Sequence, residues 1–173
     1  MAKVKFSKFK FESPEVKTIT FQGQEIEVKT YLPINEKLIL IGNVINFSAD
    51  ELKFYNVGKL KLFFTLEVIF NYTNISFTDK QKEDVCKLYD NVVYSGLYDL
   101  IIDAIGYKEI ELCKEILEET TVAIYEYNNS IVGIVDALSQ KYENSKFDLT
   151  ELSQKLSDPN ALPLLKEIVG KLG

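Results

Sequence analysis

Two runs of alternating apolar and polar residues flank Gly23, and they limit the possible folds more than any other feature of the chain. The first run covers residues 17–22, and the second follows Gln24 and ends near Tyr31. A period of two places successive side chains on opposite faces of a strand, so the two runs predict a β-hairpin over residues 17–31. Because an isolated hairpin is marginally stable in water, this one must pack on helices or extend a larger sheet.

Helical spacing of apolar residues dominates the chain after the hairpin. Asn35 is in position to cap a first helix, and we predict that this helix buries Leu38, Ile41, Val44 and Ile45. A second helix is expected over residues 59–72. It is apolar on most sides, and such a helix is usually central in its domain.

A strong helix start follows at Thr78 and Gln81, which have the spacing of a capping box. The helix that begins there is expected to end at Gly96, because glycine is the preferred residue just after a helix. A short helix over residues 97–105 and a long helical stretch over residues 107–143 complete the predicted body.

These elements predict a mainly α protein with a small N-terminal β-hairpin, at the margin of the α+β class. No internal repeat, low-complexity segment or linker divides the sequence, so one domain over residues 1–173 is the simplest organisation. It comprises an extended basic arm, the hairpin, the helical body and short C-terminal helices, expected over residues 1–11, 17–31, 35–143 and 148–172 respectively.

Composition narrows the possible chemistry. The chain contains no His, no Arg and no Trp, and all 20 basic residues are lysines. His is the side chain that most often transfers protons near neutral pH and the commonest ligand of transition metals, and Arg is the usual clamp for phosphate. No glycine-rich phosphate loop or metal-ligand spacing takes their place. We therefore expect no catalytic, cofactor-binding or metal-binding residues, and no cofactor.

The two cysteines and the hydropathy indicate the compartment. Cys86 and Cys113 both occupy apolar positions of helical patterns, so we interpret them as buried free thiols of a reducing compartment. No run approaches the roughly 20 apolar residues that cross a bilayer. The lysines at the N-terminus are not followed by the apolar block of a secretory signal. We expect no membrane partner.

Charge is distributed unevenly along the chain. The net charge is −6, but residues 1–10 carry four lysines and no acid. The alternation over residues 3–11 is typical of an edge strand or an extended arm, which either packs on its own domain or reaches an acidic partner or another copy. Four lysines on an acidic protein form a poor phosphate footprint, so nucleic acid is disfavoured as a partner. The candidate contact residues here are Lys3, Lys5, Phe6, Lys8, Phe9, Lys10 and Phe11.

Two further groups of candidate contact residues are aromatic or C-terminal. The chain has ten tyrosines, and without Trp or Arg, Tyr is the natural anchor residue of an interface. We select Tyr94 and Tyr98, for which the edge of the core is the other interpretation. Near the C-terminus, an apolar helix either docks on the body or binds a partner, and its candidate contact residues are Leu164, Leu165 and Ile168.

Three stretches of the sequence carry a family resemblance. They read VKTYLPINEKLILI, FNYTNISFTDKQKEDVCKLYD and YSGLYDLIIDAI, within roughly residues 25–105. The most distinctive motifs are residues 31–37 and 72–81. These stretches resemble small proteins encoded among the structural and assembly genes of tailed phages and prophages of low-GC Gram-positive bacteria. A hairpin followed by helices is also similar to the tail assembly chaperones of such phages, which bind the tape-measure protein.

The resemblance implies a non-enzymatic role in virion morphogenesis, as a tail assembly chaperone or as a structural component of the particle. The implied partner is a phage structural or tape-measure-type protein, with self-association as a second option. The implied location is the cytoplasm of the bacterial host, or the virion. The alternative is a phage-encoded inhibitor of a host defence system, in which the acidic surface of residues 99–173 mimics nucleic acid.

Overall fold

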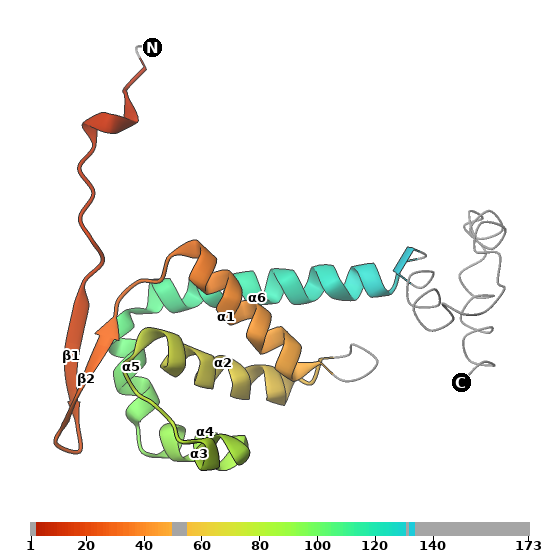
Figure 1. Cartoon of the computed structure of the whole chain (residues 1–173). Coiled ribbons are helices and arrows are strands. Elements are labelled where there is room, and N and C mark those ends of the chain that lie inside the picture. The colour runs from red at the N-terminus through yellow and green to blue at the C-terminus, as the bar shows by residue number, and fades with distance from the viewer. Residues whose placement is uncertain (1–2, 50–54, 131, 134–173) are drawn as a thin grey trace, which may run out of the picture. The chain divides into compact units, whose positions relative to one another are not determined.

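The computed structural model describes residues 3–49, 55–130 and 132–133 (Figure 1). Within these ranges the chain is mainly helical and carries one two-stranded antiparallel hairpin, which confirms the predicted fold class. Contacts divide the chain into two compact units, Met1–Glu119 and Thr120–Gly173. The C-terminal helices that we expect over residues 148–172 lie outside the described residues.

The hairpin joins β1 (Val16–Phe21) to β2 (Gln24–Lys29) through a tight turn at Gln22 and Gly23. Both turn residues have a positive φ, 50° and 76° respectively. This is the conformation of a type I′ turn, whose twist matches that of the flanking strands, and glycine adopts it without steric cost. The predicted hairpin is therefore confirmed, with its turn at the predicted glycine.

The hairpin packs one of its faces against α5 (Leu97–Ile105). Ile26 and Val28 are buried on this face, and the Lys17 ammonium donates a 2.9 Å hydrogen bond to the Ala104 carbonyl. The alternate side chains of both strands, on the opposite face, are exposed. The hairpin is thus stabilised by the helices, as its marginal intrinsic stability requires.

α1 (Ile34–Ser48) and α2 (Val57–Tyr72) pack against each other within the first unit (Figure 1). Six consecutive residues of α2, from Phe64 to Ile69, are buried, so this helix is covered on all sides over more than a turn. α2 starts two residues before its predicted first residue, because the Asn56 side chain accepts a hydrogen bond from a backbone N–H of the first turn.

α1 departs from its prediction at two positions. Pro33, and not Asn35, precedes the first helical residue, and the Pro33 carbonyl accepts hydrogen bonds from the N–H groups of Glu36 and Lys37. Leu38, which we expected to be buried, is 55% exposed, and its neighbour Lys37 is buried instead. A lysine can occupy this position because the Glu109 carboxylate pairs with it at 2.9 Å, and apolar spacing alone does not reveal such a partner.

The helix that we predicted from Thr78 to the glycine at position 96 is divided in two. α3 (Asp79–Glu83) begins with the predicted capping box between Thr78 and Gln81. Asp84 then leaves the helical conformation, and its side chain caps α4 (Val85–Tyr94) by accepting a backbone N–H of the first turn. Aspartate competes for backbone N–H groups in this way, and it therefore favours helix starts over helix interiors.

The remaining helices begin and end at the predicted glycines. Gly96, with a φ of 77°, separates α4 from α5, and Gly106, with a φ of 101°, separates α5 from α6. α6 (Tyr107–Asn128) ends at a turn over residues 129–130. The part of the predicted helical stretch after residue 133 lies outside the described residues.

The two cysteines differ in burial. Cys113 is a buried free thiol, as predicted, but Cys86 is exposed, so the prediction is wrong for this residue. α4 buries Leu88 and Val92, which are four residues apart and share a helix face. Cys86 precedes Leu88 by two residues and therefore points away from that face.

Candidate partner-binding surface

The N-terminal arm, residues 3–11, presents exposed aromatic side chains. Its one regular element is a single 3₁₀ turn, η1 (Phe6–Lys8). The rings of Phe6, Phe9 and Phe11 lie 5.0 to 6.3 Å apart between centroids, so they contact one another. Their exposed fractions are nevertheless 75%, 56% and 70%. Three adjacent rings with this exposure form a local apolar surface that is available to a partner.

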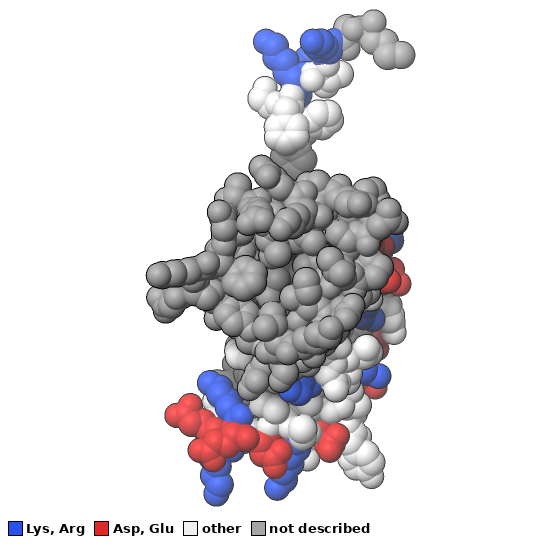
Figure 2. Space-filling view, turned by 90° about the vertical axis from the view of Figure 1, so that its right-hand side faces the viewer, with Lys and Arg blue, Asp and Glu red and all other residues white. Residues whose placement is uncertain are grey.

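The arm is also basic, and it is not covered by the rest of the described chain. All nine residues from 3 to 11 are exposed with respect to the residues that the structure describes. Figure 2 shows the lysine side chains of this segment, in blue, beside uncharged side chains, in white. A surface of this composition fits a partner whose apolar patch is bordered by carboxylates.

The two candidate tyrosines differ in their surroundings. Tyr94, at the end of α4, is 96% exposed and is available for contact. Tyr98, in the first turn of α5, is half-buried, and its hydroxyl is hydrogen-bonded to the side chain of the buried Thr65. Burial raises the pKa of the Tyr98 phenol to about 12. Tyr98 therefore packs on the body. The remaining candidates lie outside the described residues: Leu164, Leu165 and Ile168.

A polar cluster around Glu109, in α6, lies inside the first unit, in contrast to the exposed arm. One carboxylate oxygen, Oε1, accepts three hydrogen bonds. The Lys37 ammonium donates at 2.9 Å, the Tyr72 hydroxyl at 2.8 Å and the Leu32 backbone N–H at 2.9 Å. These donors come from α1, from α2 and from the segment between β2 and α1. The Glu109 carboxylate therefore joins three parts of the first unit to α6.

Lys37 and Tyr72, which donate to Glu109 in this cluster, each make one further contact. Lys37 is 1% exposed, and its Nζ lies 3.9 Å from the centroid of the Tyr31 ring, in a cation–π contact. The Tyr72 hydroxyl lies 3.4 Å from the Cys113 Sγ. Burial raises the pKa of the Tyr72 phenol and of the Cys113 thiol above their ordinary values. Both groups are thus held in their neutral forms near neutral pH, which is unsuited to nucleophilic chemistry.

Sequence reasoning missed this cluster. The available signal was Lys37 itself, which lies at helical spacing from the buried residues of α1. A lysine in an apolar stripe indicates a buried acid elsewhere, because an unpaired buried charge is strongly disfavoured. Nothing in the sequence identified Glu109 among the 26 acidic residues as that acid.

A second carboxylate, that of the buried Glu67 in α2, also accepts hydrogen bonds on one oxygen. Its Oε2 accepts hydrogen bonds from the side-chain amides of Asn43 and Asn71, both at 3.1 Å. The Asn71 amide also donates to the Glu67 carbonyl at 2.8 Å. These contacts link α1 to α2 and leave the carboxylate in a structural role.

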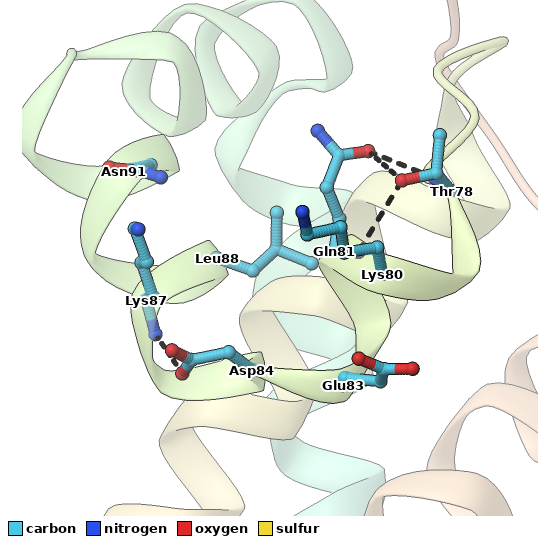
Figure 3. Close-up of a pocket in the computed structure, with 8 residues that line it drawn as sticks. All are labelled: Thr78, Lys80, Gln81, Glu83, Asp84, Lys87, Leu88 and Asn91. Atoms are coloured by element: carbon cyan, nitrogen blue, oxygen red, sulfur yellow. Dashed lines mark hydrogen bonds between the residues drawn. The ribbon is translucent and has the colours of Figure 1, made fainter.

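A surface pocket of about 640 Å³ lies between α3 and α4 (Figure 3). Its polar groups serve the helix starts. The Gln81 side chain accepts from the Thr78 N–H at 2.9 Å, and Asp84 accepts from the Lys87 backbone N–H at 3.0 Å. The dashed lines in Figure 3 mark these bonds. The pocket therefore holds capping groups, and its lysines and carboxylates do not converge on one point.

No group of three or more His, Cys, Asp or Glu side chains is arranged in the described ranges to hold a metal ion. No helix among the described residues is long and apolar enough to cross a membrane. Neither a protein family model, nor a curated protein, nor a solved structure matches the chain.

Proposed function

We propose that this chain is a non-enzymatic protein of tailed-phage morphogenesis, acting through protein–protein contacts as a tail assembly chaperone or a virion structural component. The observation that carries the proposal is the exposed arm, in which three phenylalanine rings contact one another and four lysines flank them in the sequence. Its partner would be a phage structural or tape-measure-type protein with an acidic, partly apolar surface.

The contrast between the arm and the interior supports a contact role. One oxygen of the Glu109 carboxylate accepts three hydrogen bonds, and one oxygen of the Glu67 carboxylate accepts two. The buried phenol and thiol beside Glu109 are held neutral. Among the described residues, the arm presents three exposed aromatic residues within six positions.

The two most distinctive motifs of the phage resemblance have structural roles in this chain. The motif at residues 31–37 supplies Tyr31, Leu32 and Lys37 to the Glu109 cluster. The motif at residues 72–81 supplies Tyr72 to the same cluster and then forms the capping box. The resemblance is thus carried by residues that hold the fold together, whereas the arm lies outside the resembling region and is free to fit its own partner.

Mass spectrometry of density-purified particles, from the phage or prophage that encodes the chain, tests the role. Several copies per particle would identify a virion component. Absence from particles, with co-purification of a tape-measure-type protein from the lysate, would identify a chaperone. A chain that is absent from particles and captures no phage protein would contradict both forms of the proposal.

Pull-downs with arm variants test the proposed surface. Phe6→Ala, Phe9→Ala and Phe11→Ala together should abolish capture, because they remove the exposed rings without touching the body. The matched control replaces three exposed apolar residues of α1, namely Ile34, Leu38 and Ile39, by alanine. Capture that survives the arm variant and is lost in the α1 control would place the interface on α1 instead.

One observation favours the alternative function, an inhibitor of a host defence system. α6 exposes Glu111, Glu115 and Glu118 at spacings of four and three residues, on one side of the helix, with Glu119 beside them. Reversing the charge of Glu115, Glu118 and Glu119 should then abolish inhibition of a nucleic-acid-binding defence protein. Unchanged inhibition would exclude mimicry by this surface.

A further inference from the structure

The two outer edges of the hairpin differ in the hydrogen bonding of their backbone groups. On the outer edge of β2, the Glu27 N–H donates to the Asn74 Oδ1 at 3.1 Å, and the Asn74 N–H donates to the Glu27 carbonyl at 3.2 Å. Glu27 lies opposite Thr18 in the register. Because the backbone groups of Glu27 face Asn74, those of Thr18 face away from β2, at the outer edge of β1.

The outer edge of β1 is open. The alternation of an antiparallel pair gives Val16 and Thr20 the same orientation as Thr18. The N–H and C=O groups of these three residues have no partner among the residues that the structure describes. All three side chains are exposed, uncharged and β-branched, and no proline or bulge interrupts the strand. Such an edge is a template for another strand.

We infer that the arm of a second copy of this chain closes this edge. Residues 8–12 of one copy pair antiparallel with residues 16–20 of the other, and the exchange is reciprocal about a twofold axis at Pro14. Pro14 lacks a backbone N–H. Because Pro14 lies on the axis, it is opposite Pro14 of the other copy, and only this one pair lacks its hydrogen bonds. The arm needs to break only the single 3₁₀ turn at Phe6–Lys8 to extend. The inference goes beyond the proposed phage role and does not depend on it.

Charge complementarity selects the register. On the solvent face, each arm residue of the second copy lies beside a residue of β1, which in turn lies beside a residue of β2. The arm residue and the β2 residue are two strand spacings apart, or about 9.5 Å. The resulting rows are Lys8–Thr20–Glu25, Lys10–Thr18–Glu27 and Glu12–Val16–Lys29, with the first residue of each row from the second copy. All three rows join opposite charges across a short uncharged side chain. Lys29 also lies 3.7 Å from Glu36, so the two lysine rows contribute most.

The opposite face of the paired arm is aromatic. In the same register Phe9 of the second copy lies beside Ile19, and Phe11 lies beside the aliphatic part of Lys17. Ile19 is half-buried on the face that packs against α5, so the arm extends an apolar surface that already exists. A slip of one residue would exchange the phenylalanines with the lysines and lose both matches.

Shifts of two residues are disfavoured for an electrostatic reason. A shift in one direction places Glu12 of the second copy in line with Glu27, and a shift in the other places Lys10 in line with Lys29. Each shift sets like charges in the same row, which is destabilising. The register about Pro14 is thus the one that satisfies all the rows, and its twofold symmetry closes the assembly as a dimer.

A charge-exchange experiment on the full chain tests the pairing, with sedimentation equilibrium at low salt as the measurement. The wild-type chain should be a dimer. Lys8→Glu with Lys10→Glu, or Glu25→Lys with Glu27→Lys, should each raise the dimer dissociation constant by roughly tenfold or more, since exposed pairs each contribute modestly. Combining all four substitutions should restore dimerisation, and failure to restore it would overturn the assigned rows. A monomeric wild type at millimolar concentration would overturn the pairing itself.

Disulfide trapping tests the register without relying on stability. In a Cys86→Ser background, Pro14→Cys should form a disulfide-linked dimer on mild oxidation, because the twofold axis brings the two Cα atoms within about 6 Å. Thr18→Cys should not, because eight residues of offset separate the two copies by about 27 Å. Linkage of Thr18→Cys in place of Pro14→Cys would mean that β1 pairs with β1 directly, and it would overturn the arm exchange.

Discussion

The arm and the Glu109 cluster use the same kinds of residue in opposite ways. In the cluster, Lys37 and Tyr72 are buried, Tyr31 covers the lysine from the surface, and one Glu109 oxygen accepts three donors at 2.8 to 2.9 Å. In the arm, lysines and aromatic rings are exposed, and the rings contact one another. The cluster joins α1, α2 and α6, whereas the arm is the surface that we propose for binding. Fold and recognition are therefore separable in this chain.

The largest expected effect lies in the cluster. Glu109→Ala removes the only anionic partner that Lys37 has in the described structure and leaves its ammonium, which is 1% exposed, without compensation. Breaking one side of a buried ion pair costs about 3–5 kcal/mol in the free energy of unfolding. Urea denaturation should show this loss.

Glu111→Ala is the matched control, because Glu111 is an exposed neighbour in the same helix. Its effect should stay within about 0.5 kcal/mol. The double variant Lys37→Met and Glu109→Leu should recover much of the stability, since it removes both charges and keeps the volume. An equal, small effect of Glu109→Ala and Glu111→Ala would mean that the cluster does not hold the helices together.

Tyr72→Phe makes a smaller change in the same cluster. It removes the hydroxyl that donates to Glu109 and leaves the two other donors in place. We expect a loss of about 1–2 kcal/mol, the typical net value of one hydrogen bond to a charged group. The midpoint of urea denaturation measures it. A loss as large as that of Glu109→Ala would indicate that Tyr72, and not Lys37, is the dominant partner.

The sequence predicts the parts of the fold that depend on local chemistry. The turn at Gly23, the capping box at Thr78 and the helix ends at Gly96 and Gly106 are all found where the residues require them. Residues with two local options were harder to predict. Asp84 interrupts a helix that the apolar spacing continues, because it caps the next helix.

The parts that sequence reasoning missed depend on contacts between distant residues. Lys37 is buried because Glu109 lies 72 positions further along the chain, and neither residue predicts the other. The same holds for the closure of β2 by Asn74, since the pairing with Glu27 spans 47 positions. For the candidate surface, local composition predicted an extended basic arm, and its residues are exposed with respect to the described part of the chain.

The way in which stability falls at alkaline pH distinguishes Tyr98 from a surface tyrosine. A phenol in the unfolded chain has a pKa of about 10, whereas burial raises the pKa of Tyr98 to about 12 in the folded chain. Below pH 10 both states are neutral and stability does not depend on this group. Between pH 10 and 12 the unfolded state ionises first, so stability falls as pH rises. Tyr98→Phe removes this contribution.

The measurement compares the wild type and Tyr98→Phe by urea denaturation at pH 9 and pH 11.5. At pH 9 the wild type should be more stable by about 1 kcal/mol, because it keeps the hydrogen bond to Thr65. At pH 11.5 this advantage should be smaller. An advantage that does not change with pH would mean that Tyr98 is not held neutral by burial, and would restore it as a surface contact.

The smallest expected effect on stability belongs to the arm. Deleting residues 1–11 removes no side chain that the described structure buries. At protein concentrations below the dimer dissociation constant, where dimerisation adds no stability, the free energy of unfolding should therefore change by less than about 0.5 kcal/mol. The same deletion should convert the dimer to a monomer and abolish partner capture, because it removes the rings and lysines of the arm. Denaturation and sedimentation on one preparation measure both results. If the truncated chain unfolds, the arm belongs to the core, and the separation of recognition from fold fails at its most exposed point.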